Sequence, residues 1–161
     1  MPDLLAWLPA GVLATVALSA SSALLGFGLP LAADGAQVTL VEGHGPSAEW
    51  AERNAEAAGL PLRVEQAPVE DVVARLAVPG EAYDLPDLVV LDPPRVGAGE
   101  AVCRAIAAVQ PGRIVYVACD PAALARDART LADEGYTLRR AVPLDLFPMT
   151  HHVEVVATFA R

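Results

Sequence analysis

The sequence is short of cysteine and of basic residues. It contains two cysteines, Cys103 and Cys119, which are too far apart for a Cys-x-x-Cys metal pair and too few for a disulfide framework. This usage fits a reducing, cytoplasmic compartment, and no metal site is expected. Lysine and arginine number 11 against 20 acidic residues, a net charge of −9 at pH 7. Free-standing nucleic-acid-binding proteins are usually basic, so such a role would need a locally basic face, a partner or a further domain.

Charged residues are absent from positions 4–33. A run of this length can span a bilayer, so a membrane-anchored fragment is one alternative. Against it, prolines, glycines and a serine patch interrupt the run and no basic residue flanks it. The start of the chain also lacks the basic region of a signal peptide. We favour a buried strand at 12–18, a small-residue turn, and a buried helix that ends near Asp34-Gly35.

Beyond residue 36, short apolar strands alternate with segments of helical periodicity. The expected strands are 37–42, 62–65, 85–91, 114–117, 138–144 and 153–159. The expected helices are 47–58, 69–76, 99–109, and one that opens at Asp120-Pro121 and ends near Glu134. Such alternation builds βαβ units, and the last two strands have no helix between them. The sequence predicts one α/β domain over residues 1–161, with a doubly wound, mainly parallel sheet and an antiparallel C-terminal edge hairpin.

Polar residues stand at the ends of three expected strands, namely Glu42, Asp92 and Cys119. The carboxyl ends of strands in a doubly wound sheet share one crevice, so these side chains can converge. Glu42 is well placed to bind the two hydroxyls of a ribose, although an exposed loop carboxylate gives the same pattern. Asp92 opens a stiff proline corner beside the crevice, or a merely rigid loop. The helix that follows Cys119 would lower the pKa of its thiol; the alternative is a small buried apolar residue.

Two histidines precede the last strand. His151 and His152 are adjacent, so on an extended strand they point to opposite faces and do not both reach one metal ion. A structural or orienting role for His152 is favoured over a metal role. Glu154 lies on the same face as His152 if the segment is extended. Burial in an apolar strand would raise the pKa of Glu154, which suits a general base.

Three motifs occur in a fixed order along the chain. They are Asp92-Pro93-Pro94-Arg95-x-Gly97, Tyr116-Val117-Ala118-Cys119-Asp120-Pro121-Ala122-x-Leu124-Ala125-Arg126-Asp127 and Asp145-x-Phe147-Pro148-x-Thr150-x-His152-x-Glu154. Together they closely resemble the catalytic domain of the RNA (uracil-5-)-methyltransferases, which act on tRNA or large-subunit rRNA. The resemblance is strong from about residue 84 to the end and fair over 38–60. It implies a Rossmann-like class I methyltransferase fold, with S-adenosyl-L-methionine as cofactor and RNA as partner.

The resemblance also implies a mechanism. In that family a cysteine thiolate adds to carbon 6 of uracil, because carbon 5 alone is a poor nucleophile. The enolate so formed takes the methyl group, a base removes the carbon 5 proton, and the cysteine is eliminated. By match of motif, Cys119 would be the nucleophile and Glu154 the base. Glu42 would bind the ribose hydroxyls of the cofactor, and Asp92 would line the junction of cofactor and uracil. The target uridine must lie outside its base stack.

The chain departs from the family pattern after its first strand. Where the family has an acid, an aromatic residue and a Gly-x-Gly turn, this chain has Ser19, Ser21, Ala23 and Leu25. Gly26-Phe27-Gly28 offers a displaced turn. At the positions where the family has glycine, however, this chain has residues with a Cβ atom, which would crowd the cofactor. A second cofactor acid, expected after the third strand, falls near Pro68.

Two classes of function follow from these matches and departures. The first is an RNA uracil-5 methyltransferase whose RNA is held by a further domain or partner, because the family's N-terminal RNA-binding region has no counterpart in the sequence. There is also no cysteine cluster for the iron–sulfur cluster of some members. The second is an eroded or truncated, non-catalytic binding module with an impaired cofactor site.

Overall fold

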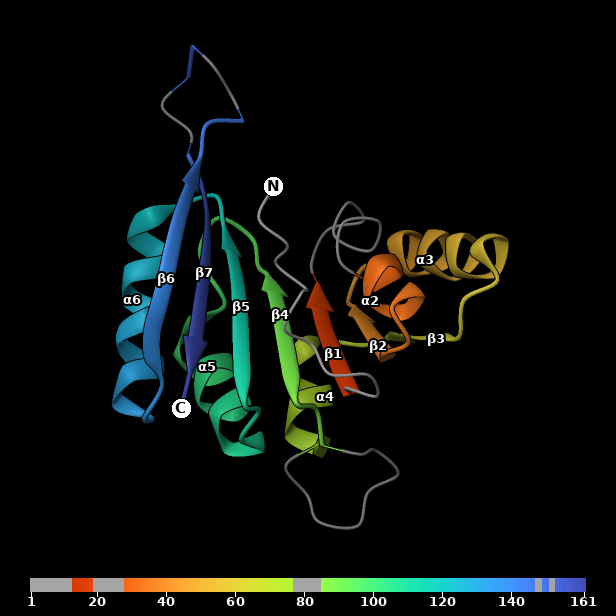
Figure 1. Ribbon diagram of the computed structural model, residues 1–161, viewed down its shortest axis with the longest axis horizontal. Helices are drawn as coiled ribbons and strands as arrows, with labels where there is room; N and C mark the ends of the chain where they lie inside the picture. Colours follow the sequence, from red (N-terminus) through yellow and green to blue (C-terminus); the bar gives the residue numbers. More distant parts are fainter. Residues whose placement is uncertain (1–12, 19–27, 77–84, 147–148, 151–152) are drawn as a thin grey trace.

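The computed structural model describes residues 13–18, 28–76, 85–146, 149–150 and 153–161. The described strands join in one seven-stranded sheet with the order β3-β2-β1-β4-β5-β7-β6 (Figure 1). They are β1 Leu13–Leu18, β2 Gln37–Glu42, β3 Leu62–Gln66, β4 Leu88–Asp92, β5 Arg113–Ala118, β6 Thr137–Leu144 and β7 Glu154–Ala160. Strands β1 to β5 pair in parallel, whereas β7 runs antiparallel to both β5 and β6.

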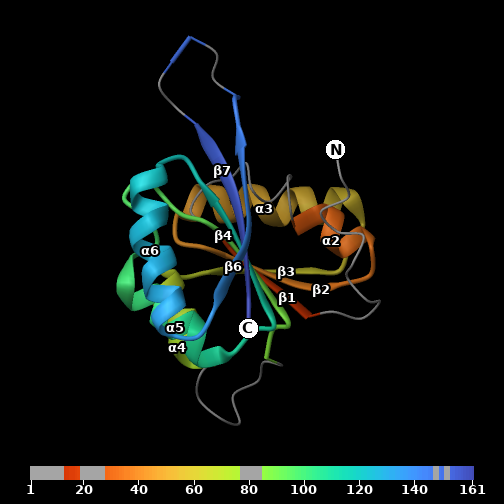
Figure 2. The ribbon, with the colours of Figure 1, turned by 60° about the vertical axis from the view of Figure 1, so that its left-hand side comes forward.

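Helices cover both faces of this sheet (Figure 1, Figure 2). The described helices are α2 Leu29–Ala33, α3 Gly45–Ala58, α4 Val69–Leu76, α5 Gly99–Val109 and α6 Pro121–Asp133. Helices α2 and α3 pack on one face, and α4, α5 and α6 pack on the other. A helix separates each parallel strand from the next along the chain, which is the connectivity of a doubly wound sheet.

An apolar cluster fills each of the two interfaces between sheet and helices. The larger cluster lies under α4, α5 and α6 and includes the fully buried side chains of Ile106, Ile114, Tyr116, Leu131 and Phe159. The smaller cluster lies under α2 and α3 and includes Leu31, Val38, Leu40, Val90 and Val115. Because successive strand residues point to opposite faces, Val90 and Leu91, or Val115 and Tyr116, serve different clusters.

Local sequence explains where the helices around the carboxyl edge begin and end. Asp120 is the N-cap of α6, and its carboxylate accepts the N–H groups of Ala122 and Ala123 at 2.8 Å each. Pro121 occupies the first turn, where its missing N–H costs nothing. Helix α3 ends at Gly59, whose φ of 64° is the left-handed conformation that glycine adopts without strain. These signals fix where the neighbouring loops start.

The prediction of a doubly wound, mainly parallel α/β sheet with an antiparallel C-terminal hairpin is confirmed. Most expected elements agree within a residue or two. Strand β4 begins at Leu88 rather than at 85, because Leu85 is 58% exposed and Pro86 has no N–H for a sheet ladder. Helix α3 begins at Gly45 rather than at 47, with Pro46 in its first turn.

The uncharged run at 4–33 contains the expected strand and helix, which are β1 and α2. Strand β1 lies in the middle of the sheet, paired with β2 and β4. In the part of the chain that the structure describes, no helix is both long enough and apolar enough to cross a membrane. The turn expected between β1 and α2 lies outside the described residues.

Candidate active site

The four residues expected to carry chemistry lie at one edge of the sheet. Glu42 and Asp92 are the last residues of β2 and β4, and Cys119 directly follows β5. Glu154 is the first residue of β7, which runs in the opposite direction. An antiparallel strand begins at the edge where its parallel neighbours end, so Glu154 joins the other three.

The register of the sheet shows how close these positions are along the edge. Ala118 pairs with Val155, so the next step along both strands brings Cys119 beside Glu154. Leu18 at the end of β1 pairs with Glu42 on one side and with Asp92 on the other. Glu42 and Asp92 therefore stand level with each other, separated by a single strand.

Side-chain alternation places the carboxylates on a common face. The neighbours Val41, Leu91 and Val155 pack into the cluster under α4, α5 and α6. Alternation along each strand then directs Glu42, Asp92 and Glu154 to the opposite face. The arrangement gathers acids at the crevice that doubly wound folds use for ligands.

A cavity of about 520 Å³ opens at the Glu42 and Asp92 half of this edge. Its walls come from the segments after β2, before α4 and after β4, together with one residue of α5. They are Glu42, Gly43, His44, Pro68, Val69, Glu70, Leu91, Asp92, Pro93, Pro94, Val96, Gly97, Ala98 and Val102. The volume is within the roughly 300–1,000 Å³ of small-molecule sites. Cys119 and Glu154 lie beyond this cavity, further along the edge.

Glu42 is held firmly at the cavity wall. Its side chain is only 3% exposed, and its Oε1 atom accepts the backbone N–H of His44 at 2.8 Å. The ring of His44 contacts the hydroxyl of Ser47, with 3.0 Å between Nδ1 and Oγ. A buried carboxylate oriented by the turn that follows it can accept hydrogen bonds from two adjacent hydroxyls of a ligand.

Among the titratable residues that line the cavity, His44 and Glu70 were not predicted from the sequence. Glu70 lies in the first turn of α4, two residues after Pro68, where the second cofactor acid was sought. An acid in the first turn of a helix is favoured by the helix dipole, and this was the signal that could have identified Glu70. His44 reaches the cavity because the chain turns directly after Glu42.

Asp92 links the cavity to the other half of the site. Burial, and then the nearby carboxylate of Glu154, together raise its pKa from 3.8 to about 6. Asp92 and Glu154 thus form an electrostatic pair across β5.

The two cysteines have opposite environments. Cys119 is half-buried at the functional edge, whereas Cys103 on α5 is completely buried. Burial, and then the carboxylate of Asp127, raise the pKa of the Cys103 thiol to about 12. A thiol that stays protonated and enclosed is a poor nucleophile. Cys119 is therefore the cysteine that chemistry at this edge can use.

Some of the predicted features cannot be placed. His151 and His152, and the departures from Ser19 to Phe27, lie outside the described residues. Among the residues that the structure does describe, no group of three or more His, Cys, Asp or Glu side chains could hold a metal ion.

The fold is shared with solved methyltransferases. The structure of the tRNA (uracil-54, C5)-methyltransferase of Pyrococcus abyssi, in complex with S-adenosyl-L-homocysteine, matches with a TM-score of 0.75 and 30% identity. The match covers 95% of this chain and 35% of that one. TrmN of Thermus thermophilus matches with a TM-score of 0.69 and 18% identity, over 94% of this chain and 44% of that one. The chain therefore has the class I methyltransferase fold.

Sequence comparison narrows this class to a family. The model of the tRNA (uracil-5-)-methyltransferase family matches residues 75–161, more than half of the chain. An uncharacterized RNA methyltransferase of Bifidobacterium longum is 44% identical over 145 residues, covering 84% of this chain and 31% of the relative. The 23S rRNA (uracil(1939)-C(5))-methyltransferase of Pseudomonas aeruginosa is 45% identical over 134 residues, which cover 83% of this chain and 29% of that relative. The chain belongs to the tRNA (uracil-5-)-methyltransferase family, and it spans about a third of the length of these curated relatives.

The raised pKa of Asp92 predicts a stability that depends on pH. Because the folded pKa of about 6 lies above the usual 3.8, the folded state binds more protons between these values and its stability falls as the pH rises through this window. We expect Asp92→Asn to raise the free energy of unfolding at pH 7.5 by about 1 kcal/mol, discounted for partial solvent exposure. The gain should fall to roughly half at pH 5. Urea denaturation at both pH values measures it, with the exposed Asp133→Asn as control. A loss of stability for Asp92→Asn at pH 7.5 would contradict the burial argument.

The contrast between the cysteines predicts selective alkylation. Iodoacetamide at pH 8 should label Cys119 in the native protein about a hundredfold or more faster than Cys103, because the Cys103 thiol is buried and protonated. Peptide mass spectrometry measures both sites, and the unfolded chain should label both equally. Comparable native rates at the two sites would show that Cys103 is accessible and that the assignment of Cys119 by environment fails.

Proposed function

We propose that the chain is the catalytic domain of an RNA uracil-5 methyltransferase, formed by residues 1–161. In this proposal it transfers a methyl group from S-adenosyl-L-methionine to carbon 5 of a uridine in tRNA or rRNA. The observation that carries the proposal is the meeting of Cys119, Glu154 and Asp92 at one sheet edge, beside a cavity that contains Glu42, in a chain of this family. The names of the relatives that match supply the substrate class.

The cavity suits the cofactor in size and chemistry. Its volume is adequate for a nucleoside-sized ligand, and its walls are mostly apolar with a few polar groups. The oriented carboxylate of Glu42 would accept hydrogen bonds from the two ribose hydroxyls. Glu70 and His44 also line the cavity and are additional candidates for contacts to the nucleoside. When bound, the cofactor supplies an electrophilic methyl group.

The other half of the site would act on the base. The thiolate of Cys119 forms a bond from Sγ to carbon 6 of uracil, and the electron pair of the 5,6 double bond moves to carbon 5 and the adjacent carbonyl. Carbon 5 would then form a bond to the methyl group as the bond between that methyl and the cofactor's sulfonium sulfur breaks, which leaves S-adenosyl-L-homocysteine. Glu154 removes the proton from carbon 5, and the bond between Sγ and carbon 6 breaks to restore the double bond. Asp92 lies between the two halves and would line the junction of cofactor and uracil.

The carboxylate pair assists this assignment. The carboxylate of Glu154 lies near enough to Asp92 to add to the effect of burial, and together they raise the pKa of Asp92 to about 6. A protonated Asp92 could also donate a hydrogen bond to a uracil oxygen.

RNA recognition would need a contribution from outside this domain. The net charge of −9 opposes the approach of a polyanion, and phosphate contacts normally supply most of the affinity for RNA. The target base must also leave its stack to reach Cys119. We propose that an RNA-binding domain or partner holds the RNA.

The thiolate mechanism predicts a covalent trap. An RNA with 5-fluorouridine at the target position cannot lose a proton from carbon 5, so the methylated adduct with Cys119 should persist and appear as a band of lower mobility on a denaturing gel. Cys119→Ala should abolish the band and Cys103→Ala should retain it. Trapping by Cys119→Ala that equals the unchanged protein would refute the nucleophile assignment.

The role of Glu42 predicts a loss of cofactor affinity. Glu42→Gln keeps the shape but removes the charge, so two charge-assisted hydrogen bonds weaken and the Kd for S-adenosyl-L-homocysteine should rise about 10-fold to 100-fold. Isothermal calorimetry measures the Kd, with the exposed Glu56→Gln as matched control. If the unchanged protein shows no binding up to millimolar ligand, the binding-module hypothesis is favoured over the enzyme.

A further inference from the structure

A buried carboxylate outside the proposed chemistry connects the two loops of the site. Asp127 is only 4% exposed, and it lies on α6, the helix that begins just after Cys119. A buried charge is costly unless hydrogen bonds compensate it. The partners of Asp127 therefore indicate what it does.

Those partners are a tyrosine hydroxyl and the start of α5. The hydroxyl of Tyr116 donates to Oδ2 of Asp127 at 2.5 Å. The N–H of Ala98 points at both acceptors, 2.8 Å from Asp127 Oδ2 and 2.9 Å from the Tyr116 oxygen. The N–H of Gly99 is 3.3 Å from the same Oδ2 atom. We call Asp127, Tyr116 and these two N–H groups the Asp127 hub.

The hub replaces a missing helix cap. The first N–H groups of a helix have no partner within it, and a polar side chain at the N-cap usually accepts them. The N-cap of α5 is Ala98, which has no such side chain. Asp127 supplies the acceptor from α6 instead, so the start of α5 and the loop before it are tied to another helix.

Gly97 is explained by the same contact. Its φ is +87°, and a Cβ atom built there would lie 2.6 Å from Oδ2 of Asp127. Any other residue would push the carboxylate away and strain the backbone. Gly97, Tyr116 and Asp127 stand in two separate sequence motifs, which this one contact joins.

The burial of the hub keeps its protons in place. Burial and the hydrogen bond to Asp127 both raise the pKa of Tyr116, so the hydroxyl remains a donor. A donor that does not titrate near neutral pH keeps the geometry constant across the working range.

The tethered loop is a wall of the cavity. Pro93, Pro94, Val96, Gly97 and Ala98 all line it, and they follow Asp92 directly. Arg126, the neighbour of Asp127, adds a contact from its Nη2 atom to the carbonyl of Val96 at 3.3 Å.

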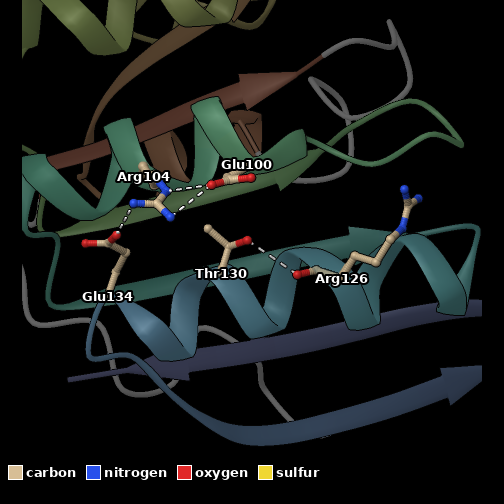
Figure 3. Close-up of polar contacts among 5 residues, drawn as sticks. All are labelled: Glu100, Arg104, Arg126, Thr130 and Glu134. Carbon is tan, nitrogen blue, oxygen red and sulfur yellow. Dashed lines mark hydrogen bonds and ion pairs between the residues drawn. The ribbon is translucent and has the colours of Figure 1, made fainter.

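Further along α5 and α6, different groups join the two helices. There Arg104 lies between Glu100 and Glu134, as Figure 3 shows. These ion pairs are exposed and lie away from the cavity, so they hold the helices without touching the loop.

We propose that Asp127 and Tyr116 are positioning residues that hold the loop 93–98 against α6, and so set the cavity wall and Asp92 relative to Cys119. The expected effect on cofactor binding rests on the proposed function. The attachment of loop 93–98 to α6, the tether, does not depend on that function.

The chain offers a matched control for the test. Tyr136 is also a buried tyrosine whose hydroxyl donates to the backbone, at 2.7 Å from the carbonyl of Pro111, but at the other edge of the sheet. Tyr116→Phe and Tyr136→Phe each remove one buried hydroxyl. Asp127→Asn keeps one acceptor oxygen, and Asp127→Ala removes both.

Two measurements test the proposal. Hydrogen exchange of the peptide that contains residues 96–99 should become about tenfold faster in Tyr116→Phe and Asp127→Ala, less so in Asp127→Asn, and remain unchanged in Tyr136→Phe. The Kd for S-adenosyl-L-homocysteine should rise about tenfold in Tyr116→Phe and Asp127→Ala, rise less in Asp127→Asn, and stay unchanged in Tyr136→Phe. If Asp127→Ala does not fold, Tyr116→Phe and Asp127→Asn decide.

The outcomes separate the two proposals. Equal exchange in Tyr116→Phe and Tyr136→Phe would overturn the tether. Faster exchange with unchanged affinity for S-adenosyl-L-homocysteine would overturn the positioning role and leave a purely structural bond. If the unchanged protein binds no S-adenosyl-L-homocysteine, the proposed function falls, and the exchange data alone still accept or reject the tether.

Discussion

The pairing of β7 with β5 is the constraint on which the candidate site depends. Parallel strands alone bring Glu42, Asp92 and the residue after β5 to the carboxyl edge, because all of them end there. A further parallel strand would place its first residue at the opposite edge. The antiparallel β7 reverses this, and the register of Ala118 with Val155 sets Glu154 beside Cys119. The carboxylate of Glu154, at the start of one strand, and the thiol of Cys119, at the end of the other, therefore become neighbours.

The same edge concentrates negative charge, and the fold compensates each acid differently. Glu42 is fixed by the N–H of His44, Asp120 by two N–H groups of α6, and Asp127 by the hub. Burial and the neighbouring carboxylate of Glu154 raise the pKa of Asp92. The hydrogen bonds to Glu42, Asp120 and Asp127 hold the turns and helix starts that these acids adjoin. A raised pKa beside a cavity, as at Asp92, is a feature that functional sites often share.

Sequence reasoning reached the strand ends but not the contacts between loops. Glu42, Asp92 and Cys119 could be predicted because a period of two and the ends of parallel strands determine both face and edge. Glu154 was named as an acid of the last strand and by its match to the third motif, and the antiparallel pairing of β7 with β5 is what brings it beside Cys119. The capping of α5 by Asp127 could not be predicted, because it joins residues 28 and 29 positions apart through side-chain packing. The predicted start of β4 at 85 was wrong because apolar Leu85 was counted as part of the strand, although Pro86 has no N–H for the sheet and Leu85 is exposed.

The motifs that carry the family resemblance are better understood as parts of one contact network than as separate signatures. Asp92 and Gly97 belong to one motif, and Tyr116, Cys119 and Asp127 to another. Gly97, Tyr116 and Asp127 have no assigned chemical role, yet they meet in one contact. The Tyr116 hydroxyl donates to Asp127, which also accepts the N–H of Ala98, and a Cβ at Gly97 would lie 2.6 Å from the same carboxylate oxygen. A loop without regular structure keeps its shape only where such contacts outweigh its conformational entropy. In our proposal, Gly97, Tyr116 and Asp127 therefore hold the cavity wall and Cys119, which lie on separate loops, at a constant separation.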